Sequence, residues 1–255
     1  MLKRFLRQSY LAITDFGFYP SVFEQSWRLT LLFLLFLCAS LAIFLTLVYA
    51  WQLGPQVDRF FDWAEQTLPP LEVRDGTLIL NSTEPILVTY SDESTWTFVF
   101  DTGGTYLDPV GLDEPALLFT EQKFFIRIQG QTQTYVWSDF GDFSINRGNI
   151  GEYETTLKFL YFPFAYGFLL VYSLLGKGFT ALLLCPLAYS VGSTYGIRLT
   201  LQNCFTICLY SLVPAVAVDM AVQLTGLKID YFEIIYLAAA AIYTFFATQK
   251  CVTAH

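Results

Sequence analysis

One uninterrupted apolar run, residues 29–50, constrains this chain more than any other feature of its sequence. At about 1.5 Å per residue, a helix of that length covers about 33 Å, which is enough to cross the ~30 Å hydrocarbon core of a bilayer. Trp27 and Trp51 flank the run, where the aromatic side chains of a membrane span meet the interface. The run therefore predicts a transmembrane helix over 29–50, with Trp27 and Trp51 as membrane-interface anchors.

The same run has a second interpretation, as the apolar core of a cleaved signal peptide. Such a core is about 7–15 residues long and is followed by small residues at the cleavage site. Here the run is longer, and the bulky Trp51 follows Val48, Tyr49 and Ala50. We therefore favour a signal anchor that is retained in the mature protein.

Residues 1–28 carry basic side chains and an amphipathic pattern. Lys3, Arg4 and Arg7 place this segment in the cytoplasm by the positive-inside rule and make it a further membrane-interface anchor. Beside them, apolar and small residues recur at helical spacing: Leu2, Phe5, Leu6, Ser9 and Ile13. We interpret the segment as an interfacial helix on anionic lipid that ends near Gly17 and Pro20. The alternative is an N-terminal segment without stable helical structure, whose basic residues only determine on which side of the membrane it lies.

The second half of the chain is apolar from residue 157 to 248, with three short polar breaks at 176–178, 192–198 and 225–230. The breaks divide a membrane region over 157–250 into four predicted spans: 157–175, 179–195, 199–224 and 231–248. Together with the first run they make five, which places the C-terminus outside the cytoplasm. Arg198 then also falls outside, which the positive-inside rule does not favour.

The net charge of −8 is the difference between two opposed regions. Only 14% of the residues are charged and 55% are hydrophobic, whereas a soluble domain has about 25% charged residues, so a soluble or nucleic-acid-binding protein is excluded. Between Gly54 and Thr156, five basic residues stand against seventeen acidic ones, a net charge of −12, and the remainder carries +4. We predict that residues 51–156 form an acidic extracytoplasmic domain that does not bind polyanions.

The pattern of this outer region is typical of a β domain. A short amphipathic helix is expected over 57–68, and Asp75-Gly76 predicts a tight hairpin turn. Segments rich in Val, Ile, Thr and aromatic residues predict strands at 71–74, 77–81, 86–90, 96–101, 116–120, 124–129 and 132–137. The predicted fold class is an α-helical integral membrane protein of about five spans with an inserted, small β-rich extracytoplasmic domain of about six strands.

Short motifs in this region resemble a known family. The stretch 68–78 (Leu-Pro-Pro-Leu-Glu-Val-Arg-Asp-Gly-Thr-Leu) is followed by Glu84-Pro85-Ile86 and then by 98–104 (Phe-Val-Phe-Asp-Thr-Gly-Gly). In this order, between one span and a terminal cluster of spans, they resemble the uncharacterised bacterial family catalogued as domain of unknown function 1189. That family is itself distantly similar to the Yip-type five-span membrane proteins. The resemblance implies a multi-pass protein of the bacterial cytoplasmic (inner) membrane and supplies no catalytic residue.

Asp101-Thr102-Gly103, directly after an apolar strand, is the motif that most suggests catalysis. Aspartic proteases use two such carboxylates that share a proton, but here the motif occurs once and continues with Gly104. We interpret it as a strand that ends in an Asp/Gly turn. The candidate outer-domain motif comprises Asp75, Gly76, Asp101, Gly103 and Gly104.

Asp219 lies within a predicted span, near its inner end. An ionisable residue in a span is a functional hypothesis by default, although Asp219 could simply reach the interface. The candidate intramembrane polar site comprises Asp219, Asn203, Tyr189 and Ser193. For the last three we prefer hydrogen bonding between helices.

The sequence offers little material for an enzyme. The only histidine is His255, so a zinc site or a Ser-His-Asp triad is excluded, and no phosphate-binding glycine loop is present.

We predict no cofactor and a non-enzymatic scaffold or accessory subunit of a bacterial cytoplasmic-membrane complex, in envelope biogenesis or trafficking. It would contact membrane lipids and bind a membrane-protein partner, or a copy of itself, through the outer domain and the spans. The alternative is a transporter or lipid-handling channel component that uses Asp219; a membrane protease or transferase comes third.

Overall fold

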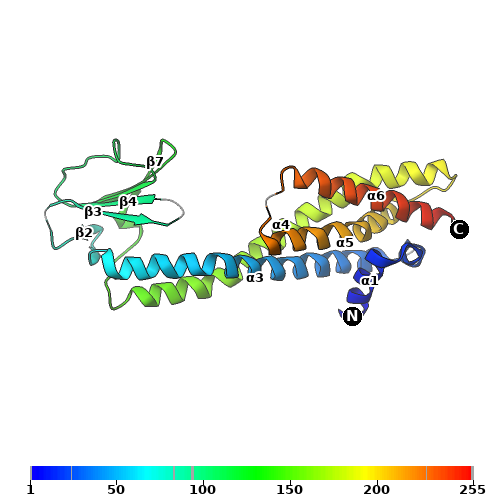
Figure 1. Ribbon diagram of the computed structural model, residues 1–255, viewed down its shortest axis with the longest axis horizontal. Coiled ribbons are helices and arrows are strands. Elements are labelled where there is room, and N and C mark those ends of the chain that lie inside the picture. The colour runs from blue at the N-terminus through cyan, green and yellow to red at the C-terminus, as the bar shows by residue number, and fades with distance from the viewer. Residues whose placement is uncertain (1, 24, 83, 93–94, 228, 254–255) are drawn as a thin grey trace. The chain divides into compact units, whose positions relative to one another are not determined.

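The structure is a computed structural model of residues 1–255 and describes all of them except 1, 24, 83, 93–94, 228 and 254–255. The chain divides into two compact units (Figure 1). The helical unit comprises residues 1–51 and 161–255, and the outer unit comprises residues 52–160. The predicted boundaries of the outer domain, 51 and 156, lie close to these limits.

Four of the described helices are long and apolar enough to cross a membrane. They are α3 (Trp27–Thr67), α4 (Ile150–Thr194), α5 (Leu201–Thr225) and α6 (Phe232–Thr253). They are preceded by α1 (Leu2–Thr14), the 3₁₀ turn η1 (Phe16–Phe18) and α2 (Tyr19–Phe23). Four apolar helices and a separate β region fit a helical membrane protein with a β domain.

The turn predicted at 176–178 is wrong, because α4 continues through Gly176, Lys177 and Gly178 without interruption. A glycine inside a helix costs only about 1 kcal/mol relative to alanine. Breaking the helix in apolar surroundings would instead leave several backbone groups unsatisfied, at several kcal/mol each. The segments 157–175 and 179–195 therefore belong to one helix.

Helix α3 is likewise continuous and includes Pro55. The apolar run over 29–50 and the separate helix expected over 57–68 are thus two parts of one helix. The boundary between the two units falls within both long helices. Residues 27–51 of α3 and 161–194 of α4 belong to the helical unit, and residues 52–67 and 150–160 belong to the outer unit.

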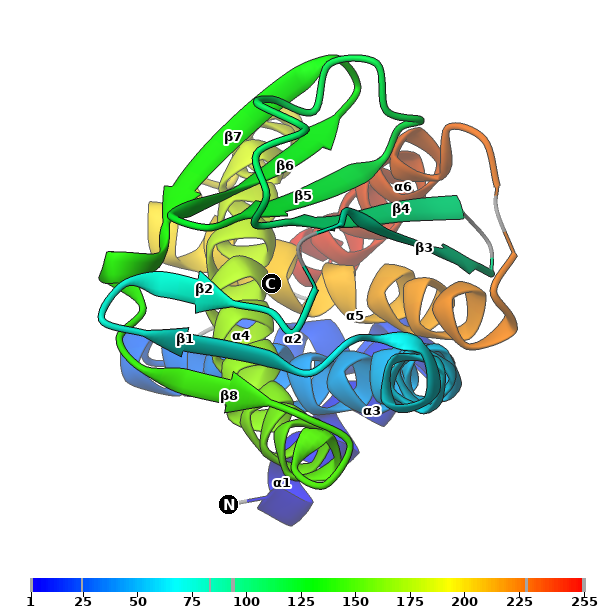
Figure 2. The same ribbon diagram turned by 90° about the vertical axis from the view of Figure 1, so that its left-hand side faces the viewer.

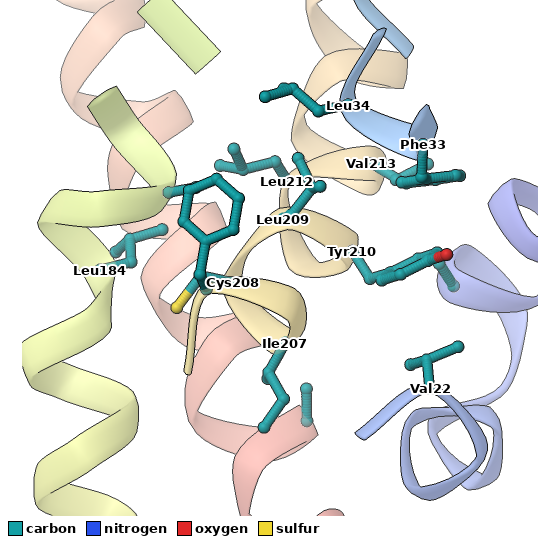
Figure 3. Packing of buried hydrophobic residues seen from close by; sticks show 14 of the residues in the cluster. Val22, Phe33, Leu34, Leu184, Ile207, Cys208, Leu209, Tyr210, Leu212 and Val213 are labelled. Atoms are coloured by element: carbon teal, nitrogen blue, oxygen red, sulfur yellow. The ribbon is translucent and has the colours of Figure 1, made fainter. Parts of the chain in front are cut away.

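Helix α5 is the centre of the helical unit. Every residue from Cys204 to Val216 is buried, as expected for a helix that is apolar on all sides and surrounded by others. Figure 3 shows Tyr210 facing Phe33 of α3, with ring centroids 4.0 Å apart, and Cys208 near Leu184 of α4. In Figure 1, α1 and the C-terminal end of α6 lie at the same end of this unit.

The predicted N-terminal helix is present as α1, but it buries a different face from the one expected. Phe5, Gln8 and Ala12 are buried, and the Tyr210 hydroxyl donates to the Gln8 side chain at 3.2 Å. Leu2 and Leu6 are exposed together with the basic residues of the helix. The helix therefore packs on α5 while part of its apolar face stays available.

The outer unit contains two sheets, which Figure 2 shows separately. The first has the order β2-β1-β8 and the second the order β3-β4-β5-β6-β7. All neighbouring strands are antiparallel except β4 and β5, which are parallel. The strand bounds are β1 Leu71–Arg74, β2 Thr77–Ile79, β3 Ile86–Ser91, β4 Thr95–Asp101, β5 Ala116–Thr120, β6 Lys123–Ile128, β7 Gln131–Val136 and β8 Phe143–Ile145.

Seven of these strands lie where the sequence predicts them, to within two residues at each end. The eighth, β8, was not expected; it pairs with β1 and is only three residues long. Phe98, Phe100 and Trp137 form the core of the unit, with Phe60 and Trp63 of α3 packed against it.

The continuity of α4 can be tested with glycine substitutions. In a helix interior Gly176→Ala is expected to raise stability by up to about 1 kcal/mol, since a Cβ at Gly176 would meet nothing within 4 Å. Gly226→Ala is a control with the opposite expected effect on stability, because Gly226 ends α5 at a φ of 65°, which alanine adopts only with strain. It should lower the thermal unfolding midpoint of the detergent-purified protein. Destabilisation by Gly176→Ala similar to that of Gly226→Ala would contradict a continuous helix.

Candidate functional site

A mostly buried ion pair joins two helices of the helical unit. Lys177 of α4 places its Nζ 3.5 Å from Oδ2 of Asp219 on α5, and their side chains are only 16% and 18% exposed. The same Nζ lies 4.2 Å from the ring centroid of Tyr236 on α6, in cation–π geometry. Three helices thus converge on one ammonium group.

The ion pair lines a cavity of about 530 Å³ that lies entirely within the helical unit. One part of the lining is apolar: Leu41 and Leu45 of α3, Leu169 and Leu183 of α4, and Leu237 of α6. The other part is polar and includes Tyr49, Ser173, Lys177, Thr180, Asp219, Gln223, Glu233 and Tyr236. Its size is within the ~300–1,000 Å³ range of small-molecule sites.

Some polar groups in the cavity have hydrogen-bonding capacity that no other group of the cavity satisfies. A direct charge-assisted hydrogen bond is about 2.7–2.9 Å long, so the 3.5 Å contact between Lys177 and Asp219 is loose. An ammonium has three donors, and Asp219 is its only polar partner among the described residues. The Tyr236 hydroxyl is buried without a hydrogen-bond partner in the part of the chain described. The arrangement can therefore accept a polar ligand without first losing a strong internal bond.

The structure does not bring the four residues of the predicted intramembrane site together. Asn203 lies sixteen residues before Asp219 on α5, about 24 Å away along the helix axis. It forms a capping box with Thr200, and its Nδ2 donates to the Phe23 carbonyl at 2.8 Å. Its role is to begin α5 and to hold the segment that precedes α3.

Tyr189 and Ser193 are exposed on α4, beyond the cavity. The sequence prediction does not include Lys177 as a functional candidate, because it interprets the Gly-Lys-Gly stretch as a turn. The sequence does contain a signal for it: Lys177 is a single cation in an apolar segment, and Asp219 is a single anion in another. Such charges usually pair with one another inside a helical bundle.

Of the predicted interface anchors, Trp51 is 71% exposed and Trp27 is 41% exposed, with the Trp27 ring 5.2 Å from that of Phe205. Lys3, Arg4 and Arg7 are all exposed on α1. Trp27 begins α3, whereas Trp51 lies within it, directly after the apolar run. Exposed Trp and basic side chains in such positions are suited to a membrane interface.

In the outer unit, Asp75 and Gly76 form the hairpin turn between β1 and β2. Their φ values of 50° and 72° are those of a type I′ turn, and Arg74 pairs with Thr77 across it. The Asp75 N–H also donates to Asp142 Oδ1 at 2.8 Å. The turn is thereby fixed to the loop before β8.

The Asp101 carboxylate holds the loop that follows β4. It is 1% exposed and accepts hydrogen bonds from the backbone N–H groups of Gly103 (3.0 Å), Gly104 (3.0 Å) and Tyr106 (2.5 Å). Both carboxylate oxygens are therefore engaged by the backbone. This geometry is that of a turn-forming aspartate.

The second candidate surface is the free edge of the five-stranded sheet. Strand β7 is the last strand in the sheet, and all six of its residues are exposed. A two-residue turn, Gln129-Gly130, with φ values of 52° and 76°, joins it to β6. Strand edges that carry no charge or proline can pair with another chain, and the sequence of β7 contains neither.

Glu114 ties this hairpin to the rest of the sheet. Its Oε2 accepts the Gly130 N–H at 2.7 Å, and its Oε1 accepts from Arg127 Nε at 2.6 Å. Arg127 also donates to the Pro109 carbonyl at 3.0 Å. The turn that begins β7 is therefore held in place by Glu114.

These bonds predict a pH dependence. The hydrogen bond from the Gly130 N–H, and then the guanidinium of Arg127, lower the pKa of Glu114 below its usual value. Because the pKa is lowered on folding, the stabilisation is fully present above the unfolded pKa and is lost as the pH falls through the folded value. Unfolding midpoints measured from pH 7 to pH 3 should decline less steeply below pH 4.5 for Glu114→Gln than for the wild type. Identical slopes would contradict the assignment.

The comparisons with known proteins give one match. A family model with the description "Protein of unknown function (DUF1189)" matches residues 6–248. No curated protein and no solved structure matches the chain. The likeness to the Yip-type proteins stays a prediction.

Proposed function

The chain belongs to the DUF1189 family, and we propose that it is a non-enzymatic scaffold or accessory subunit of a bacterial inner-membrane complex. In this proposal the outer unit binds a membrane-protein partner, in envelope biogenesis or trafficking. The partner supplies an extended segment that adds a strand to β7.

The observation that carries this proposal is the exposed edge strand β7. Natural sheets protect such edges with short strands, charges, prolines or bulges, because an open edge pairs with other chains. This edge is six residues long and neutral, and it is held by an anchored turn. In β-strand addition the main chain supplies the affinity, so no catalytic group is required.

The charge of the outer unit supports a basic partner. The region from Gly54 to Thr156 carries a net charge of −12, which attracts cationic surfaces and repels polyanions. We infer that the added strand comes from a chain that is basic around that strand, and that nucleic acids and anionic polymers are not ligands.

We further propose four membrane spans, α3 to α6, with both termini in the cytoplasm. This replaces the extracytoplasmic C-terminus that follows from five spans. It places Arg198 and Lys250 on the cytoplasmic side, in agreement with the positive-inside rule. The hydrogen bond from Gln249 Nε2 to the Tyr195 hydroxyl, 2.9 Å long, supports this arrangement because it joins the end of α6 to the α4–α5 connection.

Strand addition at β7 predicts a position-specific effect of proline. The turn makes Ile128 and Gln131 a hydrogen-bonded pair, so the alternation of an antiparallel ladder directs the N–H of Thr134 away from β6. Thr134→Pro should therefore leave the sheet folded but reduce partner recovery in a mild-detergent pull-down by at least about tenfold.

Thr134→Ala is the control, since it keeps the N–H group and should recover the partner as the wild type does. If Thr134→Pro recovers as much partner as the wild type and unfolds at the same midpoint, β7 is not the docking edge. A chain that always purifies alone from native membranes would contradict the scaffold function itself.

A second candidate function, a lipid-handling component, is favoured by the Lys177–Asp219 pair and its cavity. Asp219→Asn should reduce the transfer of a fluorescent phospholipid between the leaflets of proteoliposomes by about tenfold or more. Asp230→Asn, at an exposed aspartate before α6, should not change it. Absence of transfer by the wild type, or transfer unchanged by Asp219→Asn, would remove this candidate.

A further inference from the structure

We propose that the cavity around Lys177 binds the headgroup of a phospholipid that carries both a phosphate and a primary ammonium. The phosphate lies against Lys177 and Tyr236, and the ammonium lies against Asp219 and Glu233. This proposal deepens the second candidate function and rests on it for the place of the lipid in the bundle.

The phosphate position follows from the unused donors of the cavity. Lys177 has three N–H donors, and its contact with Asp219 is loose at 3.5 Å. The buried Tyr236 hydroxyl has no partner in the described part of the chain, and the Lys177 ammonium lies over its ring. A phosphate oxygen can accept from both groups, and it would satisfy a hydroxyl that otherwise stays buried and unbonded.

The ammonium position follows from the charge balance of the lining. Among the described residues, the charged ones that line the cavity are Lys177, Asp219 and Glu233, which together carry a net charge of −1. A ligand with a phosphate alone would place its negative charge next to two carboxylates. A ligand that also carries an ammonium replaces that repulsion with attraction, so a zwitterion fits this lining better than an anionic lipid does.

The remaining lining identifies the source of this zwitterion as a lipid. Leucines from α3, α4 and α6 also line the cavity and would contact glycerol and acyl carbons rather than a water-soluble headgroup. At about 530 Å³ the cavity holds a headgroup and the beginning of the chains, and not a whole phospholipid.

The depth of the cavity agrees with this assignment. Tyr49 lines it and lies two residues before Trp51, the exposed interface anchor at the end of the apolar run. Phe232 and Glu233, the first residues of α6, line it as well. In the proposed four-span topology this is the outer end of the bundle, where the headgroups of the outer leaflet lie.

The test is lipid binding by the full-length protein, delipidated in detergent. Binding is measured from the rise of the unfolding midpoint with ligand concentration. The probes are phosphatidylethanolamine, phosphatidylglycerol and water-soluble phosphoethanolamine. We expect phosphatidylethanolamine to bind at least about tenfold more tightly than phosphatidylglycerol, and phosphoethanolamine to give no shift at matched concentrations.

Two variants and two matched controls assign the binding to this cavity. Lys177→Gln should weaken phosphatidylethanolamine binding at least about tenfold, and Tyr236→Phe should weaken it several-fold. Tyr236→Phe keeps the ring and the ion pair, so it decides the test even if Lys177→Gln fails to fold. Lys250→Gln and Tyr243→Phe, on α6 but outside the cavity lining, should bind as the wild type does.

Three results would overturn the proposal. They are equal binding of phosphatidylglycerol, a shift by phosphoethanolamine as large as that by the lipid, and wild-type affinity in Tyr236→Phe. Because binding is measured without transfer, a lipid that binds but is not moved between leaflets leaves this inference standing and removes only the lipid-handling function.

Discussion

The continuity of α4 is the constraint on which the rest of the helical unit depends. Because the helix does not break at Gly176 and Gly178, Lys177 is carried into the bundle, where it meets Asp219 of α5 and the ring of Tyr236. A helix keeps its backbone groups bonded in apolar surroundings, and two glycines do not offset that gain. With α4 unbroken, the described residues contain four helices that are long and apolar enough to cross a membrane.

The two candidate surfaces use different chemistry and follow from different parts of the sequence. The cavity combines a loose ion pair with leucine side chains in its lining, which suits an amphiphilic ligand. The β7 edge is neutral and offers main-chain groups, within a region that carries most of the negative charge of the chain. In the function proposed above, the cavity is the site for a lipid and the β7 edge is the site for a protein partner of an accessory subunit.

The sequence predicts local structure well and long-range pairing poorly. Seven strands and the Asp75-Gly76 turn follow from composition and turn chemistry, because those signals lie within a few neighbouring residues. Strand β8 is as short as β2, but β2 directly follows the Asp75-Gly76 turn, whereas the partner of β8 is β1, which lies far earlier in the chain. Likewise, the capping of α5 by Asn203 depends on neighbouring residues and can be read locally. The hydrogen bond from Asn203 to Phe23 and the contact between Lys177 and Asp219 depend on how distant segments pack.

The central claim is that Lys177 lies inside the bundle and is coupled to Asp219. A double-mutant cycle of unfolding free energies with Lys177→Gln, Asp219→Asn and the double variant measures this coupling directly. The account predicts a coupling energy of about 1–3 kcal/mol, because each single change leaves the partner charge buried and unpaired. Additive effects of the two substitutions would contradict the pairing, and with it the placement of Lys177 on a continuous α4.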